Sequence, residues 1–242
     1  FFICVITQMK KPFQFKQFLI HAMPGVLPVG TDGILLGGWT HIKSARRILD
    51  VGTGTGLLCL MIAQRAPEAY IEGIDISPSA IQAAQHNISL SRFHSRIDVQ
   101  EADIRTYTAQ PFDLIITNPP FFDTGPRHQN TQLATARHTD SLTLSALLSA
   151  ISPLLAAEGT ISMILPSQKL SLALEEAEIR GLFPARITYV SATPFKPPHR
   201  VLLQFTQSVE VLQEEELIIQ VGGPNEYSAS YVRLTKDFYV FM

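Results

Sequence analysis

Short apolar runs alternate with stripes of apolar residues at helical spacing along most of this 242-residue chain. The short runs predict buried strands, because they are too short for helices and are bounded by turn residues. They lie at residues 47–51, 70–75, 96–103, 114–116, 161–165, 186–190 and 201–205. The stripes predict helices at residues 57–65, 78–88, 142–157 and 167–180. This alternation is typical of an α/β protein with helices packed on a mostly parallel sheet.

The length favours a single large domain, and no internal repeat or long linker divides the chain. Residues 13–242 are predicted to form this domain, with an N-terminal lid region at 13–43 and a C-terminal extension at 208–242. Residues 1–12 are a separate N-terminal segment. Its native status is open, because Met9 resembles a translation start and eight residues precede it.

The lid region contains two local patterns. Aromatic and polar residues interleave at 13–18, which predicts an edge strand; the alternative is a surface for a nucleobase. Further on, Thr31 or Asp32 is predicted to cap a short apolar helix at 34–39. A capped helix at this position could cover a ligand.

A glycine-rich turn follows the strand at 47–51. Gly52, Gly54 and Gly56 remove side chains where the backbone bends and a ligand comes close. The dinucleotide-binding fingerprint requires its third glycine at position 57, which is occupied by Leu57. The turn therefore favours a ligand that approaches the backbone without a pyrophosphate.

Acidic residues end the next two strands. Asp75 lies 19 residues after Gly56, a position that suits the diol of a ribose. Its alternative role is a helix cap, but Ser77 and Pro78 already supply a cap and a first-turn proline. Asp103 follows the third strand and could accept a hydrogen from an adenine amino group; the alternative is an ordinary loop carboxylate.

An amide and two prolines end the apolar run at 114–116. Asn118 and Pro119 are followed by Pro120 and Phe121, so two oxygen acceptors are expected beside an aromatic face at the carboxyl edge of the sheet. Such a group fits a planar amine, whose two hydrogens it could bind while its lone pair faces an electrophilic carbon. The alternative is an Asx-type turn that only ends the strand.

Composition limits the remaining classes of function. No apolar stretch approaches the ~20 residues of a membrane helix, which predicts no membrane partner. The two cysteines, Cys4 and Cys59, suggest a reducing compartment and hence a cytoplasmic protein. The seven histidines show no metal-ligand spacing, so no metal is expected. The formal net charge of −2 weighs against a nucleic-acid partner.

The order of elements and two motifs resemble the class I S-adenosylmethionine-dependent methyltransferases. The glycine motif begins at Asp50, and Asn118 begins the motif of members that methylate amino groups. Within this class the chain resembles the bacterial valine-tRNA adenine-37 N6-methyltransferases. The resemblance rests on residues 15–18, 29–37, 198–203 and 234–242. It implies a Rossmann-like fold whose seven-stranded sheet has an antiparallel last strand and helices on both faces.

The resemblance also implies roles for particular residues. S-adenosylmethionine would be bound by the glycine motif, two strand-end carboxylates, the lid and the amide, namely Asp50, Gly52, Gly54, Gly56, Asp75, Asp103, Thr31, Asp32 and Asn118. Thr31 and Asp32 would lie near its methionine end. Asn118 and Pro119 would orient adenine N6, with Pro120 and Phe121 completing the catalytic motif. Phe121 replaces the commoner tyrosine and keeps a stacking face.

The implied substrate is adenine 37 in the anticodon loop of a valine tRNA. An unpaired base costs less to present than one flipped out of a duplex. The basic residues predicted to contact RNA are Lys16, Arg127, Arg137, Lys196, Arg200, Arg233 and Lys236. The oligomeric state is open, with a monomer preferred.

Three other functions stay open on sequence alone. A protein glutamine could be methylated on N5 by nearly the same amide chemistry, as in release-factor methyltransferases. Those enzymes carry a helical domain before the core, for which the residues ahead of the glycine motif leave little room. Methylation of an amino group in ribosomal RNA is the second alternative, since it needs no different pocket. A non-catalytic RNA module that binds S-adenosylmethionine is the third alternative, and the intact Asn118 and Pro119 argue against it.

Overall fold

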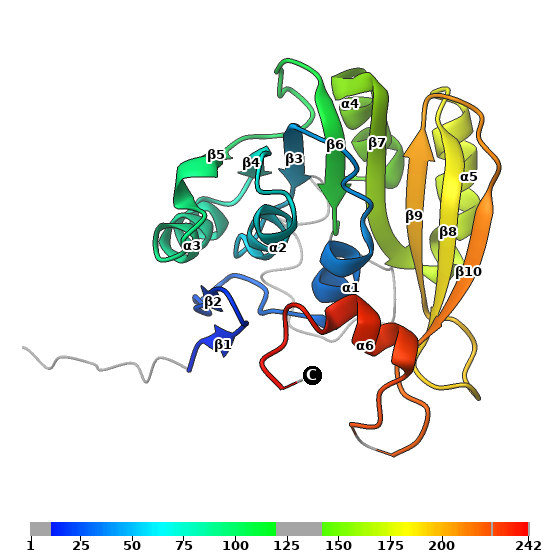
Figure 1. Ribbon diagram of the computed structural model, residues 1–242. Helices are drawn as coiled ribbons and strands as arrows, with labels where there is room; N and C mark the ends of the chain where they lie inside the picture. Colours follow the sequence, from blue (N-terminus) through cyan, green and yellow to red (C-terminus); the bar gives the residue numbers. More distant parts are fainter. Residues whose placement is uncertain (1–10, 120–141, 224, 242) are drawn as a thin grey trace, which may run out of the picture.

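A single mixed sheet organises the part of the chain that the computed structural model describes, which comprises residues 11–119, 142–223 and 225–241 (Figure 1). Its strand order is β10-β8-β9-β7-β6-β3-β4-β5. β9 is antiparallel to β7 and β8, and every other neighbouring pair is parallel. The strands are β3 (Arg47–Val51), β4 (Tyr70–Asp75), β5 (Ile97–Glu101), β6 (Phe112–Thr117), β7 (Leu155–Pro166), β8 (Phe183–Ser191), β9 (Arg200–Thr206) and β10 (Gln213–Ile218).

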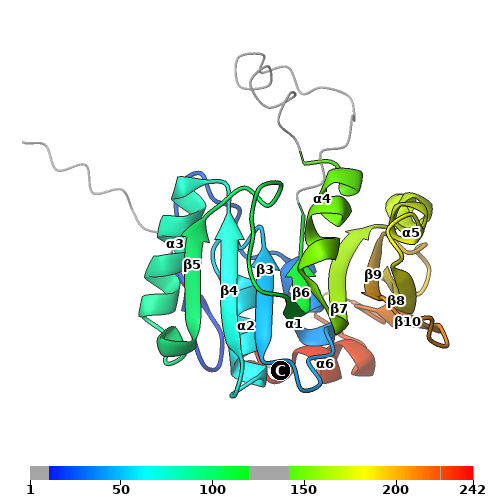
Figure 2. The same cartoon turned by 90° about the horizontal axis from the view of Figure 1, so that it is seen from above.

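Helices cover both faces of this sheet, as expected (Figure 2). Alternate residues of a strand point to opposite faces, so Ile48 of β3 joins one apolar core and Leu49 joins the other. One face is covered by α1 (Thr31–Trp39), α2 (Leu57–Arg65) and α3 (Pro78–Ser89), and the other by α4 (Leu144–Ile151) and α5 (Leu170–Glu178). The 3-10 turns are η1 (His94–Arg96), η2 (Ser152–Leu154) and η3 (Ser167–Lys169).

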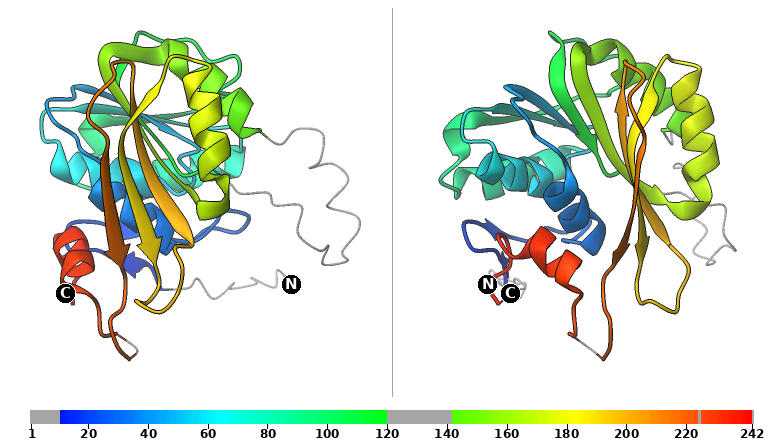
Figure 3. Two further views of the ribbon diagram at one scale, coloured as in Figure 1. Left: turned by 90° about the vertical axis from the view of Figure 1, so that its right-hand side faces the viewer. Right: turned by 45° about the vertical axis from the view of Figure 1, so that its right-hand side comes forward.

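The early and late parts of the described chain pack together. β1 (Phe13–Gln14) and β2 (Leu19–Ile20) form a small antiparallel pair, and Phe15 bridges to Tyr239. The Lys16 N–H donates to the Phe238 carbonyl at 2.8 Å. Figure 3 shows α6 (Ala229–Thr235) packed beside α1. The predicted boundaries of the lid region and the C-terminal extension stay predictions.

The extension adds an eighth strand to the expected seven. β10 begins at Gln213 and pairs in parallel with β8 at the edge of the sheet. The apolar residues of β10 begin only at Leu217, and the three glutamates before it disfavour a strand. These side chains are exposed on the edge strand, where charge is tolerated and discourages pairing with other chains.

Two helix predictions were wrong in their bounds. The helix expected at 142–157 ends at Ile151, and Leu155 already belongs to β7. The apolar stripe continued because Leu155 is buried in the same core as Leu148, although it is in a strand. α1 begins at Thr31, and its N-cap is Gly30 without a side-chain cap bond. Neither Thr31 nor Asp32 therefore caps the helix.

Candidate functional site

A cavity of about 410 Å³ lies at the carboxyl ends of β3, β4, β5 and β6. The parallel arrangement brings these ends to one edge, where ligands bind in open α/β sheets. The cavity is bounded by the loops after these strands, by the segment before α1 and by the start of α2. Of the predicted site residues, Gly52, Gly54, Asp75, Asp103, Asn118 and Pro119 line it.

The glycine turn after β3 forms one wall of the cavity. All three of its glycines have positive φ, with values of 77° at Gly52, 55° at Gly54 and 79° at Gly56. A Cβ added at Gly52 would meet nothing within 4 Å, whereas one added at Gly56 would lie 3.3 Å from Ala84 of α3. Gly52 and Gly54 therefore leave room in the cavity. Gly56 instead permits packing and does not line the cavity.

Asp75 is held at the end of β4 by the backbone around it. One carboxylate oxygen accepts from the Gly54 N–H at 3.0 Å, and the other accepts from the Ser77 N–H at 2.9 Å. The Ser77 side chain caps α3 as predicted. Each Asp75 oxygen keeps acceptor capacity for a further donor, such as a ribose hydroxyl. The two bonds fix the carboxylate relative to the glycine turn.

Asp50 lies beneath the glycine turn instead of lining the cavity. It is fully buried, and its Oδ2 accepts from the Thr53 hydroxyl at 2.7 Å and from the Cys59 thiol at 3.3 Å. Burial raises the pKa of Asp50 to about 6, and burial followed by the Asp50 charge raises the pKa of the Cys59 thiol. Asp50 thus supports the turn from below, and a direct role towards a cofactor stays a prediction.

Asp103 lines the cavity two residues after β5 ends. Both of its oxygens accept from the Arg105 guanidinium, at distances of 2.6 to 3.0 Å. These hydrogen bonds hold the pKa of Asp103 below its usual range. Arg105 also lines the cavity, so this wall presents a paired carboxylate and not an isolated one.

Asn118 and Pro119 follow β6 at the rim of the cavity. The end of β6 is fixed by the Thr117 hydroxyl, which donates to the Val51 carbonyl of β3 at 2.9 Å. α1 packs beside Asn118 so closely that a Cβ added at Gly33 would lie 3.9 Å from Asn118 Nδ2. Pro120 and Phe121 lie outside the described residues.

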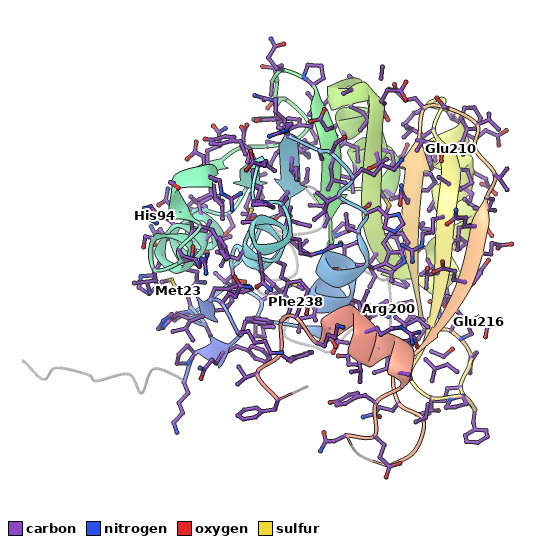
Figure 4. All side chains as sticks on the ribbon, viewed as in Figure 1. Met23, His94, Arg200, Glu210, Glu216 and Phe238 are labelled. Carbon is purple, nitrogen blue, oxygen red and sulfur yellow. The ribbon has the colours of Figure 1, made fainter. Side chains whose placement is uncertain are left out.

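The two lid residues predicted near the cofactor do not line the cavity; Gly30 and Gly33 do. Asp32 instead forms an ion pair with Arg200, with 2.8 Å between Asp32 Oδ2 and Arg200 Nε (Figure 4 labels Arg200). Both side chains are partly buried. Arg200 was predicted to contact RNA, and the ion pair ties it to α1.

The other predicted RNA contacts that the structure describes come from the β1–β2 pair, from α6 and its C-cap, and from the β8–β9 loop. Lys16 Nζ donates to the Lys236 carbonyl at 2.5 Å, so these two residues are neighbours. Arg233 is exposed on α6, and Lys196 is exposed in the β8–β9 loop. Arg127 and Arg137 lie outside the described residues.

The segment before α1 lies within the lid region predicted at 13–43, but sequence reasoning missed which of its residues border the cavity. Residues 25–30 line the cavity. Buried Asn87 of α3 anchors the chain just before this segment, because its Oδ1 accepts from the His21 N–H at 2.9 Å while its Nδ2 donates to the Thr55 carbonyl at 2.9 Å. Asn87 thus joins the chain ahead of the covering segment to the glycine turn. A lone asparagine in a helical stripe carries no signal that could have predicted this.

Two findings concern metals and membranes. Among the described residues, no group of three or more His, Cys, Asp or Glu side chains is arranged to hold a metal ion. None of the helices in the described part of the chain has the length and apolar character that crossing a membrane requires.

The fold and the cavity define a class I methyltransferase. The family described as Methyltransferase small domain matches residues 32–144. A predicted O-methyltransferase from Agrobacterium tumefaciens has a similar fold, with a TM-score of 0.68 at 21% identity over 86% of this chain and 96% of that one. A methyltransferase from Pyrococcus furiosus gives a TM-score of 0.60 at 16% identity over 79% of this chain and 90% of that one.

Curated relatives narrow this class to one family. A tRNA1(Val) (adenine(37)-N6)-methyltransferase from Vibrio parahaemolyticus is 44% identical over 96% of this chain and 97% of its own length. One of the same name from Bacteroides fragilis is 40% identical over 97% of this chain and all of its own length. The chain belongs to the tRNA1(Val) (adenine(37)-N6)-methyltransferase family. The family and the methyltransferase class predicted from the sequence are confirmed.

Proposed function

We propose that this protein transfers a methyl group from S-adenosylmethionine to the exocyclic N6 of adenine 37 in the anticodon loop of a valine tRNA. One observation carries the proposal: Asn118 and Pro119 line the same cavity as Gly52, Gly54 and Asp75. Acceptors suited to a planar amine thus share a cavity with a wall suited to a nucleoside. The names of the relatives supply the tRNA and the position of the adenine.

The cavity fits S-adenosylmethionine better than a dinucleotide. The space beside Gly52 is open, so a ligand can approach the backbone there. Leu57 lines the cavity at the position where a dinucleotide site needs its third glycine. Asp75 would accept the ribose hydroxyls, and apolar Ile104 would contact the adenine beside Asp103.

Asn118 and Pro119 would act on the nucleophile. Bound S-adenosylmethionine supplies a sulfonium-activated methyl group as the electrophile. The Asn118 side-chain oxygen and the Pro119 carbonyl would accept the two N6 hydrogens, which favours a pyramidal nitrogen and turns its lone pair towards the cofactor side of the cavity. Both acceptors also stabilise the positive charge that grows on N6 during transfer, and water can take the released proton.

The substrate assignment is tested with tRNA from cells that lack this protein. The purified enzyme and labelled S-adenosylmethionine should convert adenine to N6-methyladenosine in a valine tRNA, detected by nucleoside analysis of separated tRNAs. tRNA from cells that contain the protein is the matched control and should accept little label. Label found instead in ribosomal RNA or in a release-factor glutamine would overturn the substrate while keeping the fold class.

The role of the amide is tested by Asn118→Ala. Removing one positioned hydrogen-bonding group at a reacting centre commonly costs about 100-fold or more in kcat. We expect a loss of that size, with a much smaller change in cofactor affinity measured by calorimetry. Asn118→Asp keeps an acceptor oxygen and should retain more activity than Asn118→Ala. Wild-type turnover in Asn118→Ala would show that the side chain does not orient the amine.

A further inference from the structure

The β8–β9 loop presents an exposed aromatic ring at the edge of the sheet where the cavity lies. Phe195 is 94% exposed, and residues 194–198 around it are exposed as well. β7 and β8 are both antiparallel to β9, and β6 is parallel to β7. β8 therefore runs parallel to β6. The loop that follows β8 therefore leaves the sheet at the same edge as Asn118.

Hydrogen bonds within the loop and to neighbouring segments hold this loop. The Lys196 N–H donates to the Thr193 carbonyl at 3.2 Å, which closes a four-residue turn with Pro194 at its second position. The Ser167 hydroxyl donates to the Pro198 carbonyl at 2.8 Å, and the Gln220 N–H donates to the Ala192 carbonyl at 3.0 Å. Three prolines further restrict the backbone. A partner that binds Phe195 therefore pays little to order the loop.

The loop is also connected to the catalytic edge. Arg200 begins β9 directly after the loop and pairs with Asp32 of α1. The next residue of α1, Gly33, lies against Asn118. β8 and β6 are three strand spacings apart, which is about 14 Å. An RNA loop whose target base enters the cavity can place another of its unpaired bases against the loop that leaves the sheet there.

We infer that Phe195 is a stacking platform for an unpaired base near the target adenine, with Lys196 beside it for a phosphate. Proteins that recognise single-stranded RNA commonly stack splayed bases on exposed aromatic rings next to basic side chains. This places a substrate contact on a residue outside the catalytic motif and outside the basic residues predicted from the sequence. The inference rests on the proposed RNA substrate and names one of its contacts.

The first test compares Phe195→Ala with the wild-type enzyme on valine tRNA. Loss of one stacked base should raise the KM for tRNA on the order of tenfold and leave the KM for S-adenosylmethionine unchanged. Phe195→Tyr should restore the wild-type value because it keeps the ring. Ile179→Ala is the matched control, since Ile179 is an exposed apolar residue after α5 at the opposite edge of the sheet, and it should behave as wild type.

The second test asks whether the ring touches a base. Valine tRNAs that each lack one unpaired base near the target are bound to wild-type and Phe195→Ala enzyme. At the stacked position, the loss of binding free energy from removing the base and the loss from Phe195→Ala should not add, as expected for groups in direct contact. Additive losses at every position would overturn the inference.

Fluorescence gives an independent signal. The chain has one tryptophan, Trp39, which is 3% exposed, so its emission gives a steady background. Phe195→Trp adds an exposed indole whose emission should be quenched by wild-type tRNA and not by a tRNA that lacks the stacked base. Unchanged emission on binding would also overturn the inference.

The inference and the proposed function fail separately. If wild-type enzyme methylates valine tRNA and Phe195→Ala matches it in KM, the stacking contact is wrong and the proposed function stands. If wild-type enzyme methylates no tRNA, the proposed function fails and the inference fails with it.

Lys196→Ala should weaken tRNA binding and lower the salt dependence of that binding by about one phosphate contact.

Discussion

Two glycine-rich segments of the molecule use the same residue for opposite reasons. In the turn after β3, a Cβ added at Gly52 would meet nothing within 4 Å. In α1, a Cβ added at Gly38 would lie 2.7 Å from the Leu234 carbonyl oxygen of α6. The turn is glycine-rich because its backbone has positive φ and borders the cavity. The helix is glycine-rich because its neighbours lie too close for a side chain.

A glycine motif therefore does not by itself locate a ligand. Glycine in a helix interior costs about 1 kcal/mol relative to alanine, so α1 keeps Gly37 and Gly38 at a cost in helix propensity. Packing against α2 and α6 offsets this cost. Gly56 combines both reasons, because its φ is positive and an added Cβ would lie 3.3 Å from Ala84.

Gly38→Ala should give the largest effect. The added methyl meets a backbone carbonyl that cannot rotate away, so we expect a loss of about 3 kcal/mol in the free energy of unfolding, despite the better helix propensity of alanine. Gly37→Ala is the matched control. Its methyl would meet the flexible Met61 side chain, and about 1 kcal/mol is expected. Urea midpoints at unchanged slope measure both values. Equal losses would contradict the packing account.

Asp50→Asn tests what supports the turn. The folded protein binds the Asp50 proton more tightly than the unfolded chain, because burial raises its pKa to about 6. Its contribution to stability is therefore fully present below the unfolded pKa and is lost as the pH rises through about 6. The stability of the wild type should fall relative to Asp50→Asn by roughly 2 kcal/mol between about pH 4 and pH 7. Parallel stability curves for the two proteins would show that Asp50 does not titrate in this range.

Gly52→Ala should have the smallest effect on stability. The new side chain meets no atom, and only the positive φ opposes it, at about 1 kcal/mol. Its methyl would project beside the cavity, so the affinity for S-adenosylmethionine should fall on the order of tenfold or more while Gly38→Ala keeps its affinity once folded. Calorimetry on both folded variants separates the two outcomes. Wild-type affinity in Gly52→Ala would place the cofactor elsewhere.

Much of the fold could be predicted because local pattern and packing agree. β3, β4 and β6 lie where the apolar runs predict them, and Ser77 caps α3. Prediction failed where packing decided instead. Leu155 continues the helical stripe but is buried in strand β7, and Gly159 of β7 approaches the Phe112 backbone closely, which no periodicity reveals.

The site could be predicted where strand ends determine it, and not where distant residues meet. Strand ends place Asp75 and Asn118 at one cavity, because the sheet is parallel there and brings those ends to one edge. The Asp32–Arg200 pair joins residues 168 positions apart, and the sequence shows no sign of it. Asn87 was missed for the same reason. Long-range partners depend on how elements meet in space.

The contact between α1 and α6 can form only late in synthesis, because α6 lies near the end of the described chain. About 190 residues separate the end of α1 at Trp39 from the start of α6 at Ala229, and a ribosome needs roughly 10 to 40 s to make them. During that time Gly38 faces no Leu234, and Lys16 has no Phe238 carbonyl to bond. α1, the helix beside Asn118, is the first helix of the described chain to be made, and α6, which packs against it, is the last. A nascent chain therefore carries α1 and the cavity edge beside it before the α6 contact to Gly38 can form.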